Sequence, residues 1–156
     1  MNGFKMILAA AKLAKRAHKN QKRKQGTPYF THPKAVARLL WNLDYKSPDL
    51  IAAAYTHDVL EDAPQFAAEL KTTLSEEAYR LVEAVTKKKG ESLEGHYYRI
   101  LLAGTEARIL KQADRNHNNS EVSMLPKEHP TYQAAIVKTK LMLRIFGLKT
   151  IAITGK

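Results

Sequence analysis

The chain has 156 residues, of which 44% are hydrophobic, no cysteine, and a formal net charge of +11. This length and hydrophobic share fit one domain with a buried core, which we expect to cover residues 1–156. The lack of cysteine excludes disulfides and thiolate metal sites. No apolar run approaches membrane-spanning length, and lysines interrupt the apolar stretch near the N-terminus, where we expect an amphipathic helix rather than a signal peptide. The expected location is the cytoplasm.

Positive charge is concentrated in the first part of the chain. Residues 1–43 carry ten Lys and Arg and no acidic residue, whereas residues 44–94 carry eleven acidic residues against six basic ones. A basic stretch of this kind attracts a polyanion, whether a nucleotide, RNA or DNA. A solvated helix face accounts for most of the charges before residue 20.

Turn and capping signals divide the chain into about eight helices, without an alternating strand pattern or a repeat, which predicts an all-α fold. In chain order, the predicted elements are a helix near 3–19, a basic loop at 20–31, a helix from Pro33, a buried helix at 48–62, a short piece from Pro64, a helix capped by Ser75 and closed by the bases of Lys87–Gly90, a helix capped by Thr105, and a final helix at about 131–146. We expect Trp41 in the core.

Ionisable residues follow a run of small and apolar residues in the helix predicted at 48–62. Four of them, His57, Asp58, Glu61 and Asp62, fall within six positions. In a buried helix they would be very costly unless they were paired or bound to a metal. On a helix, the pairs His57–Glu61 and Asp58–Asp62 are four residues apart, so the four side chains can line one cleft. A charged helix end is the plain alternative.

Two further residues, His32 and Asp114, lie in helix-forming segments of their own. Together with His57 and Asp58 they supply two imidazoles and two carboxylates from three segments. Such nitrogen and oxygen donors suit a borderline-to-hard divalent ion and leave coordination positions for water. Nearby acidic residues could move protons without being needed as ligands. The pattern predicts a metal-dependent hydrolase.

Three segments of the chain resemble, in order, the sequence blocks of the HD-domain alarmone hydrolases. These are the hydrolase halves of RelA/SpoT-type enzymes and their stand-alone small relatives. The blocks are RKQGTPYFTHPKAVARLL (23–40), AAAYTHDVLEDA (52–63) and ILKQADRNHN (109–118). The resemblance implies an HD-type bundle of about eight helices around a metal, and the chain has no room for the synthetase or regulatory domains of the long alarmone enzymes.

The resemblance also implies roles for individual residues. The metal ligands would be His32, His57, Asp58 and Asp114, with manganese as the family's usual ion and iron or cobalt able to use the same donors. Glu61 and Asp62 match the acidic pair needed for hydrolysis. The substrate-binding residues would be Arg23, against the base, with Lys24, Tyr29 and Asn118, and Arg115 would help to offset phosphate charge.

The reaction implied is hydrolysis of the 3′-diphosphate of ppGpp or pppGpp, which yields GDP or GTP and pyrophosphate. A divalent ion would lower the pKa of its bound water and polarise the phosphoryl oxygen. Glu61 and Asp62 would orient that water and move protons. The expected partner is therefore a small nucleotide, and the sequence leaves the oligomeric state open.

Departures from the family pattern keep other functions open. Gln112 breaks the usual Lys-Leu-Ala-Asp-Arg, and Glu121 replaces a threonine that helps to hold substrate, where a carboxylate would repel phosphate. Another nucleotide is therefore an alternative substrate, such as an adenosine alarmone or a phosphorylated dinucleotide cofactor. A basic nucleic-acid-binding module and a degenerate metal-bound sensor are further alternatives, but neither has a use for a complete ligand set with both acidic residues.

Remaining polar residues have plainer interpretations. His18, His96 and His129 are expected on the surface, and His117 near the site but outside the coordination shell. On the final helix, Lys138, Lys140 and Arg144 form a solvated face, one of whose members could reach a distal phosphate.

Overall fold

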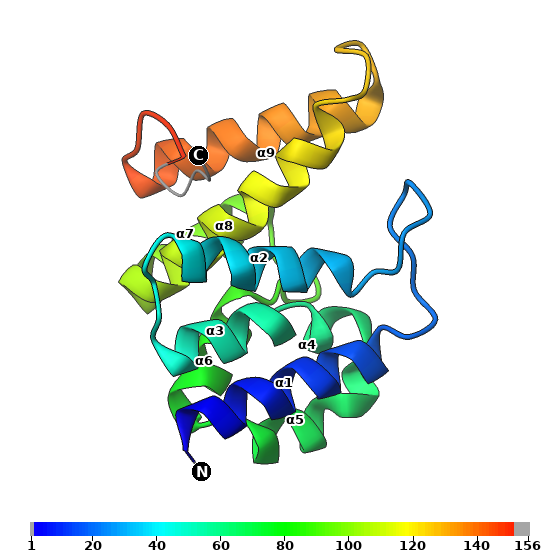
Figure 1. Ribbon diagram of the computed structural model, residues 1–156. Coiled ribbons are helices and arrows are strands. Elements are labelled where there is room, and N and C mark those ends of the chain that lie inside the picture. Colours follow the sequence, from blue (N-terminus) through cyan, green and yellow to red (C-terminus); the bar gives the residue numbers. More distant parts are fainter. Residues whose placement is uncertain (1, 152–156) are drawn as a thin grey trace.

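The computed structural model describes residues 2–151, which form a bundle of α-helices without a regular strand (Figure 1). The elements are α1 (Gly3–Ala17), α2 (Thr31–Asn42), α3 (Pro48–Thr56), α4 (Val59–Asp62), a short 3-10 helix η1 (Pro64–Phe66), α5 (Ala67–Thr73), α6 (Glu76–Val85), α7 (Leu93–Ala103), α8 (Thr105–Val122) and α9 (Pro130–Phe146). The predicted all-α fold is confirmed.

Serine side chains begin three of the helices. Ser47, Ser75 and Ser92 each accept a hydrogen bond from a backbone amide in the first turn of α3, α6 and α7, which satisfies a donor that the helix cannot pair internally. The cap predicted at Thr105 is displaced by one residue, because Thr105 is the first residue of α8 and Gly104 stands at the cap with φ 111°. That left-handed backbone favours glycine.

The helix predicted at 48–62 is broken at His57–Asp58, which was not foreseen. His57 Nδ1 donates to the Ala54 carbonyl at 2.8 Å, the acceptor that the amide of Asp58 would use in a continuous helix. Thr56 Oγ1 likewise donates to a carbonyl in the preceding turn. The helical pattern resumes in α4, where the Asp62 amide donates to the Asp58 carbonyl at 2.9 Å.

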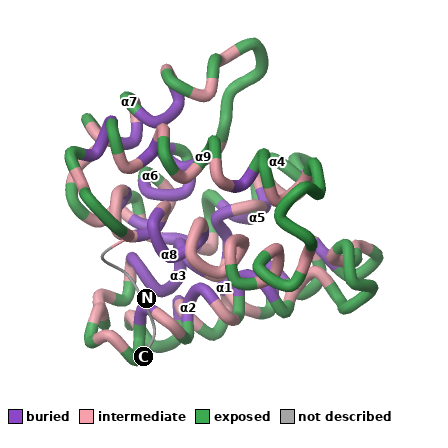
Figure 2. Tube along the Cα trace, turned by 90° about the horizontal axis from the view of Figure 1, so that it is seen from above, coloured by how far each residue is buried: buried purple, intermediate pink, exposed green. Residues whose placement is uncertain are grey.

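Helix α3 lies at the centre of the core. The two helices that precede it in the sequence, α1 and α2, pack against it, and so do α6 and α8, which follow it. Its Ala52–Ala54 run is fully buried, and these small side chains let the neighbouring helices approach closely. Figure 2 shows the buried stretches of α3 and α8 in the interior of the molecule. Helix α9 packs on α7 and α8 and adds Met142 and Phe146 to the core.

Three expectations about burial were wrong. Trp41 is 48% exposed, with Lys46 Nζ 5.8 Å from its ring centroid. His18 is buried because it stacks on Tyr29, with ring centroids 4.7 Å apart. His96 is buried beside the backbone-capping Arg99, and burial lowers the pKa of its imidazole to about 4.

Within residues 2–151, none of the helices has the length and apolar character needed to cross a membrane.

Candidate metal centre

The side chains of His32, His57, Asp58 and Asp114 converge at one point. His32 Nε2 lies 3.1 Å from Asp114 Oδ1 and 3.6 Å from Asp58 Oδ2. His57 Nε2 lies 3.1 Å from Asp58 Oδ2 and 3.6 Å from Asp114 Oδ1. One donor atom each from His32, His57 and Asp58 fall within 4.8 Å of one another. This spacing suits a single divalent ion.

Three separate parts of the fold supply these side chains. His32 comes from the first turn of α2, and Asp114 from α8. His57 and Asp58 come from the break between α3 and α4, which turns both side chains toward the same point. His32, His57 and Asp114 are at most 5% exposed, so their polar atoms are largely removed from water. Burial of this kind is costly unless the groups are paired or hold an ion.

One nitrogen of His57 has no hydrogen-bond partner within the described part of the chain. Because Nδ1 donates to the Ala54 carbonyl, Nε2 is the nitrogen left to bind an ion, and it is buried beside the two carboxylates. A buried polar atom without a partner calls for an explanation, and a bound cation supplies one. The other histidine of the cluster, His32, is oriented by His117, because its Nδ1 lies 2.8 Å from His117 Nδ1.

The electrostatics of the site favour a cation. Burial lowers the pKa of His57, but the carboxylates of Asp58 and Asp114 outweigh it and raise the pKa well above its ordinary value. Burial raises the pKa of Asp58, yet His57 lowers it further, and Lys111 and the histidines do the same for Asp114. Both carboxylates therefore stay ionised. The field that draws a proton onto His57 also attracts a divalent ion, which would displace that proton.

Further polar side chains orient the two carboxylates. Tyr29 Oη donates to Asp58 Oδ2 at 2.8 Å, and Asn118 Nδ2 donates to Asp114 Oδ1 at 2.7 Å. Lys111 Nζ donates to the other oxygen of Asp114 at 2.9 Å. Contacts of this kind fix the direction in which a ligand points. The sequence did not single out Lys111, although its position one turn before Asp114 gave the signal.

The acidic pair lies on α4, on the solvent side of this cluster. Glu61 lines the same cavity as His32, Asp58 and Asp114, and its Oε2 accepts a hydrogen bond from the Lys87 amide at 3.3 Å. Asp62 lies near Tyr29, and partial burial together with the negative charge of Asp58 raises the pKa of its carboxyl. A raised pKa suits a group that exchanges protons near neutral pH.

A cavity of about 1060 Å³ is lined by His32, Asp58 and Asp114 at the candidate metal centre and by residues of α8 and α9. This volume lies just above the range of roughly 300–1,000 Å³ that is typical of small-molecule sites. The residues predicted to bind substrate all line it, namely Arg23, Lys24, Tyr29, Arg115 and Asn118. The structure therefore joins these residues and the candidate metal centre in one cavity.

Arg23 is held by residues far away in the sequence. Its Nε donates to both oxygens of Glu121, at 3.2 and 3.0 Å, and its Nη2 donates to Asn118 Oδ1 at 2.8 Å. Its Cζ stands 5.2 Å from the centroid of the Tyr29 ring. Glu121 was expected to repel phosphate, but Arg23 offsets its charge. The hydrogen bonds from Arg23 and Gln25 outweigh burial and lower the pKa of Glu121.

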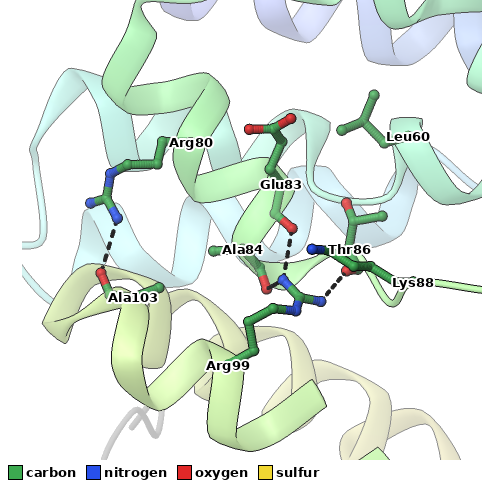
Figure 3. Close-up of a pocket in the computed structure, with 8 residues that line it drawn as sticks. All are labelled: Leu60, Arg80, Glu83, Ala84, Thr86, Lys88, Arg99 and Ala103. Carbon is green, nitrogen blue, oxygen red and sulfur yellow. Dashed lines mark hydrogen bonds between the residues drawn. The ribbon is translucent and has the colours of Figure 1, made fainter. Parts of the chain in front are cut away.

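A second hollow, of about 410 Å³, lies between α6 and α7 (Figure 3). Arg99 donates there to the backbone carbonyls of Glu83, Ala84 and Thr86, at 3.1, 2.9 and 2.7 Å, and Arg80 donates to the Ala103 carbonyl at 3.0 Å. The carbonyls at the end of α6 are therefore capped by Arg99, and not by the lysines that follow the helix. Both guanidinium groups are engaged by backbone carbonyls, so we interpret this hollow as part of the packing between α6 and α7 and not as a binding site.

Comparisons with known proteins agree with this geometry. The HD domain family matches residues 10–139. The chain is 35% identical over 127 residues to "Bifunctional (p)ppGpp synthase/hydrolase SpoT" of Escherichia coli strain K12, which covers 74% of this chain and 18% of that protein. It is 34% identical over 133 residues to "GTP pyrophosphokinase" of Streptomyces coelicolor, which covers 80% of this chain and 16% of that protein. The chain thus spans less than a fifth of these two relatives.

A solved structure shares the fold. It is described as "A metazoan ortholog of SpoT hydrolyzes ppGpp and plays a role in starvation responses" and superposes with a TM-score of 0.76 at 20% identity, covering 90% of this chain and 85% of that one. The likeness in sequence and fold therefore extends over most of the chain. The chain belongs to the HD domain family and is related to the hydrolase domains of SpoT- and RelA-type proteins.

Proposed function

We propose that the chain is a metal-dependent hydrolase that removes the 3′-diphosphate of ppGpp and pppGpp, yielding GDP or GTP and pyrophosphate. The observation that carries the proposal is the buried, unpartnered Nε2 of His57, which faces two ionised carboxylates at one end of a nucleotide-sized cavity. The names of the relatives support the choice of substrate, because the Escherichia coli relative is called a (p)ppGpp synthase/hydrolase.

We assign His32, His57, Asp58 and Asp114 as the ligands of one divalent ion, and manganese as its identity. When bound, such an ion lowers the pKa of a coordinated water and polarises a phosphoryl oxygen. Tyr29, Asn118 and Lys111 keep the carboxylates in place for it through the hydrogen bonds described above. The four proposed ligands come from three parts of the fold, so the ion would also link α2, α8 and the α3–α4 break.

Proton transfer in the proposed reaction falls to the acidic pair. A water oxygen bonds to phosphorus, the bond from phosphorus to the 3′ oxygen breaks, the water loses a proton, and the 3′ oxygen receives one. Glu61 lines the cavity and is placed to accept the proton of the water. Asp62, whose pKa is raised, is suited to hold a proton and return it to the leaving oxygen.

Arg23 and Tyr29 form the proposed surface for the base. A guanidinium is flat and stacks on ring systems, and Glu121 and Asn118 hold this one by its edge. Since Glu121 offsets its charge, Arg23 suits an uncharged purine better than a phosphate. Within residues 2–151, Lys24 Nζ donates to Thr131 Oγ1 at 3.3 Å and pairs with no carboxylate, so its charge stays available for phosphate.

A hydrolysis screen tests the proposal. The manganese-loaded protein is incubated with ppGpp, pppGpp, an adenosine alarmone, a phosphorylated dinucleotide cofactor and single-stranded RNA, and the products are separated by anion-exchange chromatography. We expect pyrophosphate with GDP or GTP from the guanosine alarmones. Turnover confined to the adenosine compound or the dinucleotide would replace the substrate assignment, and tight RNA binding without turnover of any compound would replace the enzyme by a binding module.

A further inference from the structure

The cavity has a second group of polar residues, on the side formed by α7, α8 and α9. Arg115 of α8 and Lys138 of α9 both line it, and neither makes a hydrogen bond or ion pair with another residue in the range 2–151. The Nε of Arg115 is also buried. Free cations that face a cavity, one of them partly removed from water, mark a place where an anion binds.

Tyr97 of α7 provides an independent sign at the same place. Its side chain is fully buried, it lines the cavity, and its hydroxyl has no hydrogen-bond partner in the part of the chain that the structure describes. The cations Arg115 and Lys111 line the same cavity, and burial raises the pKa of this hydroxyl while their charges act in the opposite direction. A buried hydroxyl without a partner is costly, so a ligand that accepts its hydrogen bond would be stabilised.

Lys138 is surrounded by like charges. Partial burial lowers the pKa of its ammonium, and Arg115, Lys111 and Lys24 lower it further. Among the groups that act on it, the acidic one is Asp114, which is already engaged by Lys111 and by the two histidines. Positive charge therefore exceeds negative charge on this side of the cavity. An anion with several acceptor oxygens would correct this excess.

This group is separate from the candidate metal centre. The ring of Tyr97 packs edge-on against Phe146 of α9, with centroids 6.1 Å apart, which fixes it at the junction of α7 and α9. The candidate metal ligands instead come from α2, α8 and the α3–α4 break. Arg115 follows Asp114 on α8, and consecutive helical residues point about 100° apart, so the two side chains serve different sides of the helix.

We propose that Tyr97, Arg115 and Lys138 form a phosphate subsite for the group of the substrate that is not cleaved, which is the 5′-diphosphate or 5′-triphosphate of the nucleotide. Naming that group rests on the proposed function, whereas the capacity to bind a diphosphate does not. Arg115 offers a planar fork of donors, Lys138 a point charge and Tyr97 one hydroxyl donor. The subsite thus selects nucleotides that carry phosphates at both ends.

Binding of inorganic pyrophosphate to the metal-free protein isolates the subsite, because without an ion the carboxylates of Asp58 and Asp114 repel an anion. Isothermal titration calorimetry compares the wild type with Lys138→Ala, Tyr97→Phe and the control Lys140→Ala. Lys140 is exposed like Lys138 and lies two residues along α9, but it does not line the cavity. We expect affinity to fall about tenfold or more in the first two variants and to stay unchanged in the control. Tyr97→Phe should melt no lower than the wild type, since it removes only an unpartnered hydroxyl.

Equal affinity in all four proteins would overturn the proposal, and so would an equal loss in Lys140→Ala, which would mean general surface attraction. A second measurement separates this proposal from the first. Lys138→Ala should raise the KM for ppGpp about tenfold and leave the KM for guanosine 3′-diphosphate, which has no 5′ phosphate, within about twofold. If the wild type hydrolyses neither compound but binds pyrophosphate through Lys138, the proposed function is refuted and the subsite stands. Normal turnover with an unchanged KM for ppGpp in Lys138→Ala refutes the subsite alone.

Discussion

The substitution Arg23→Lys keeps a positive charge in the cavity wall but removes the flat guanidinium group. The guanidinium of Arg23 makes hydrogen bonds to Glu121 and Asn118 at the same time and stands over Tyr29. An ammonium at the end of a lysine cannot reproduce this flat, forked arrangement. A purine that stacks on the guanidinium would lose roughly 1–2 kcal/mol, which corresponds to about a 5- to 30-fold rise in KM.

The assay is steady-state hydrolysis of ppGpp with manganese at low and high salt. We expect the KM to rise by that factor at both salt concentrations and kcat to change little, because Arg23 is distant from the reacting bond in the proposed complex. The matched control is Arg16→Lys. Arg16 also pairs with a carboxylate, that of Glu69, and stands over a ring, that of Phe66 at 5.9 Å, but it is exposed and outside the cavity.

Two results would refute the reasoning. An unchanged KM in Arg23→Lys would mean that the guanidinium contributes only its charge. A rise that disappears at high salt would mean the same, since screening weakens attraction between exposed charges and leaves stacking largely intact.

His57→Ala should leave a folded protein that binds little manganese and has no turnover, and full metal occupancy by elemental analysis would contradict the ligand assignment. Glu61→Gln should lower kcat by about two to four orders of magnitude with little change in substrate binding, and an unchanged kcat in the amide variants of both Glu61 and Asp62 would point to another proton acceptor. Because the two carboxylates raise the pKa of His57 well above 6.5, the metal-free protein holds a proton there at neutral pH. Manganese must displace it, so metal affinity should increase with pH through neutrality and about one proton should be released per ion, measured by titration in weakly buffered solution; affinity that is independent of pH between 6 and 8 would refute a protonated His57.

Local signals in the sequence predicted much of the fold. The helix starts at Pro48 and after Ser75 depend on residues within one turn of the start, and the structure has both. Burial was harder to predict where the deciding partner is distant or absent. His96 is buried through the neighbouring Arg99, whose own role is to cap α6, and Trp41 stays exposed because no helix covers it fully.

The sequence likewise predicted some residues of the candidate site and missed contacts between distant ones. Residue type and order pointed to His32, His57, Asp58 and Asp114, and the structure brings these side chains together. Their roles as ligands stay predictions. The pairing of Arg23 with Glu121 joins residues 98 positions apart, and no spacing rule could foresee it. Tyr97 also escaped notice, because a tyrosine between His96 and Tyr98 belongs to no ligand-binding pattern that the sequence offers.

The interruption between α3 and α4 gives the side chain of His57 a structural role as well as a functional one. The imidazole of His57 ends α3 with one nitrogen and leaves the other buried beside two carboxylates, so one side chain shapes the backbone and faces the site. A residue that favours helix at position 57 would let the chain continue, which favours the folded state. It would also leave the carboxylates of Asp58 and Asp114 without the charge of His57, which is costly for buried groups. In a selection that ignores turnover, retention of histidine at this position would therefore show that its charge outweighs the gain from a continuous helix.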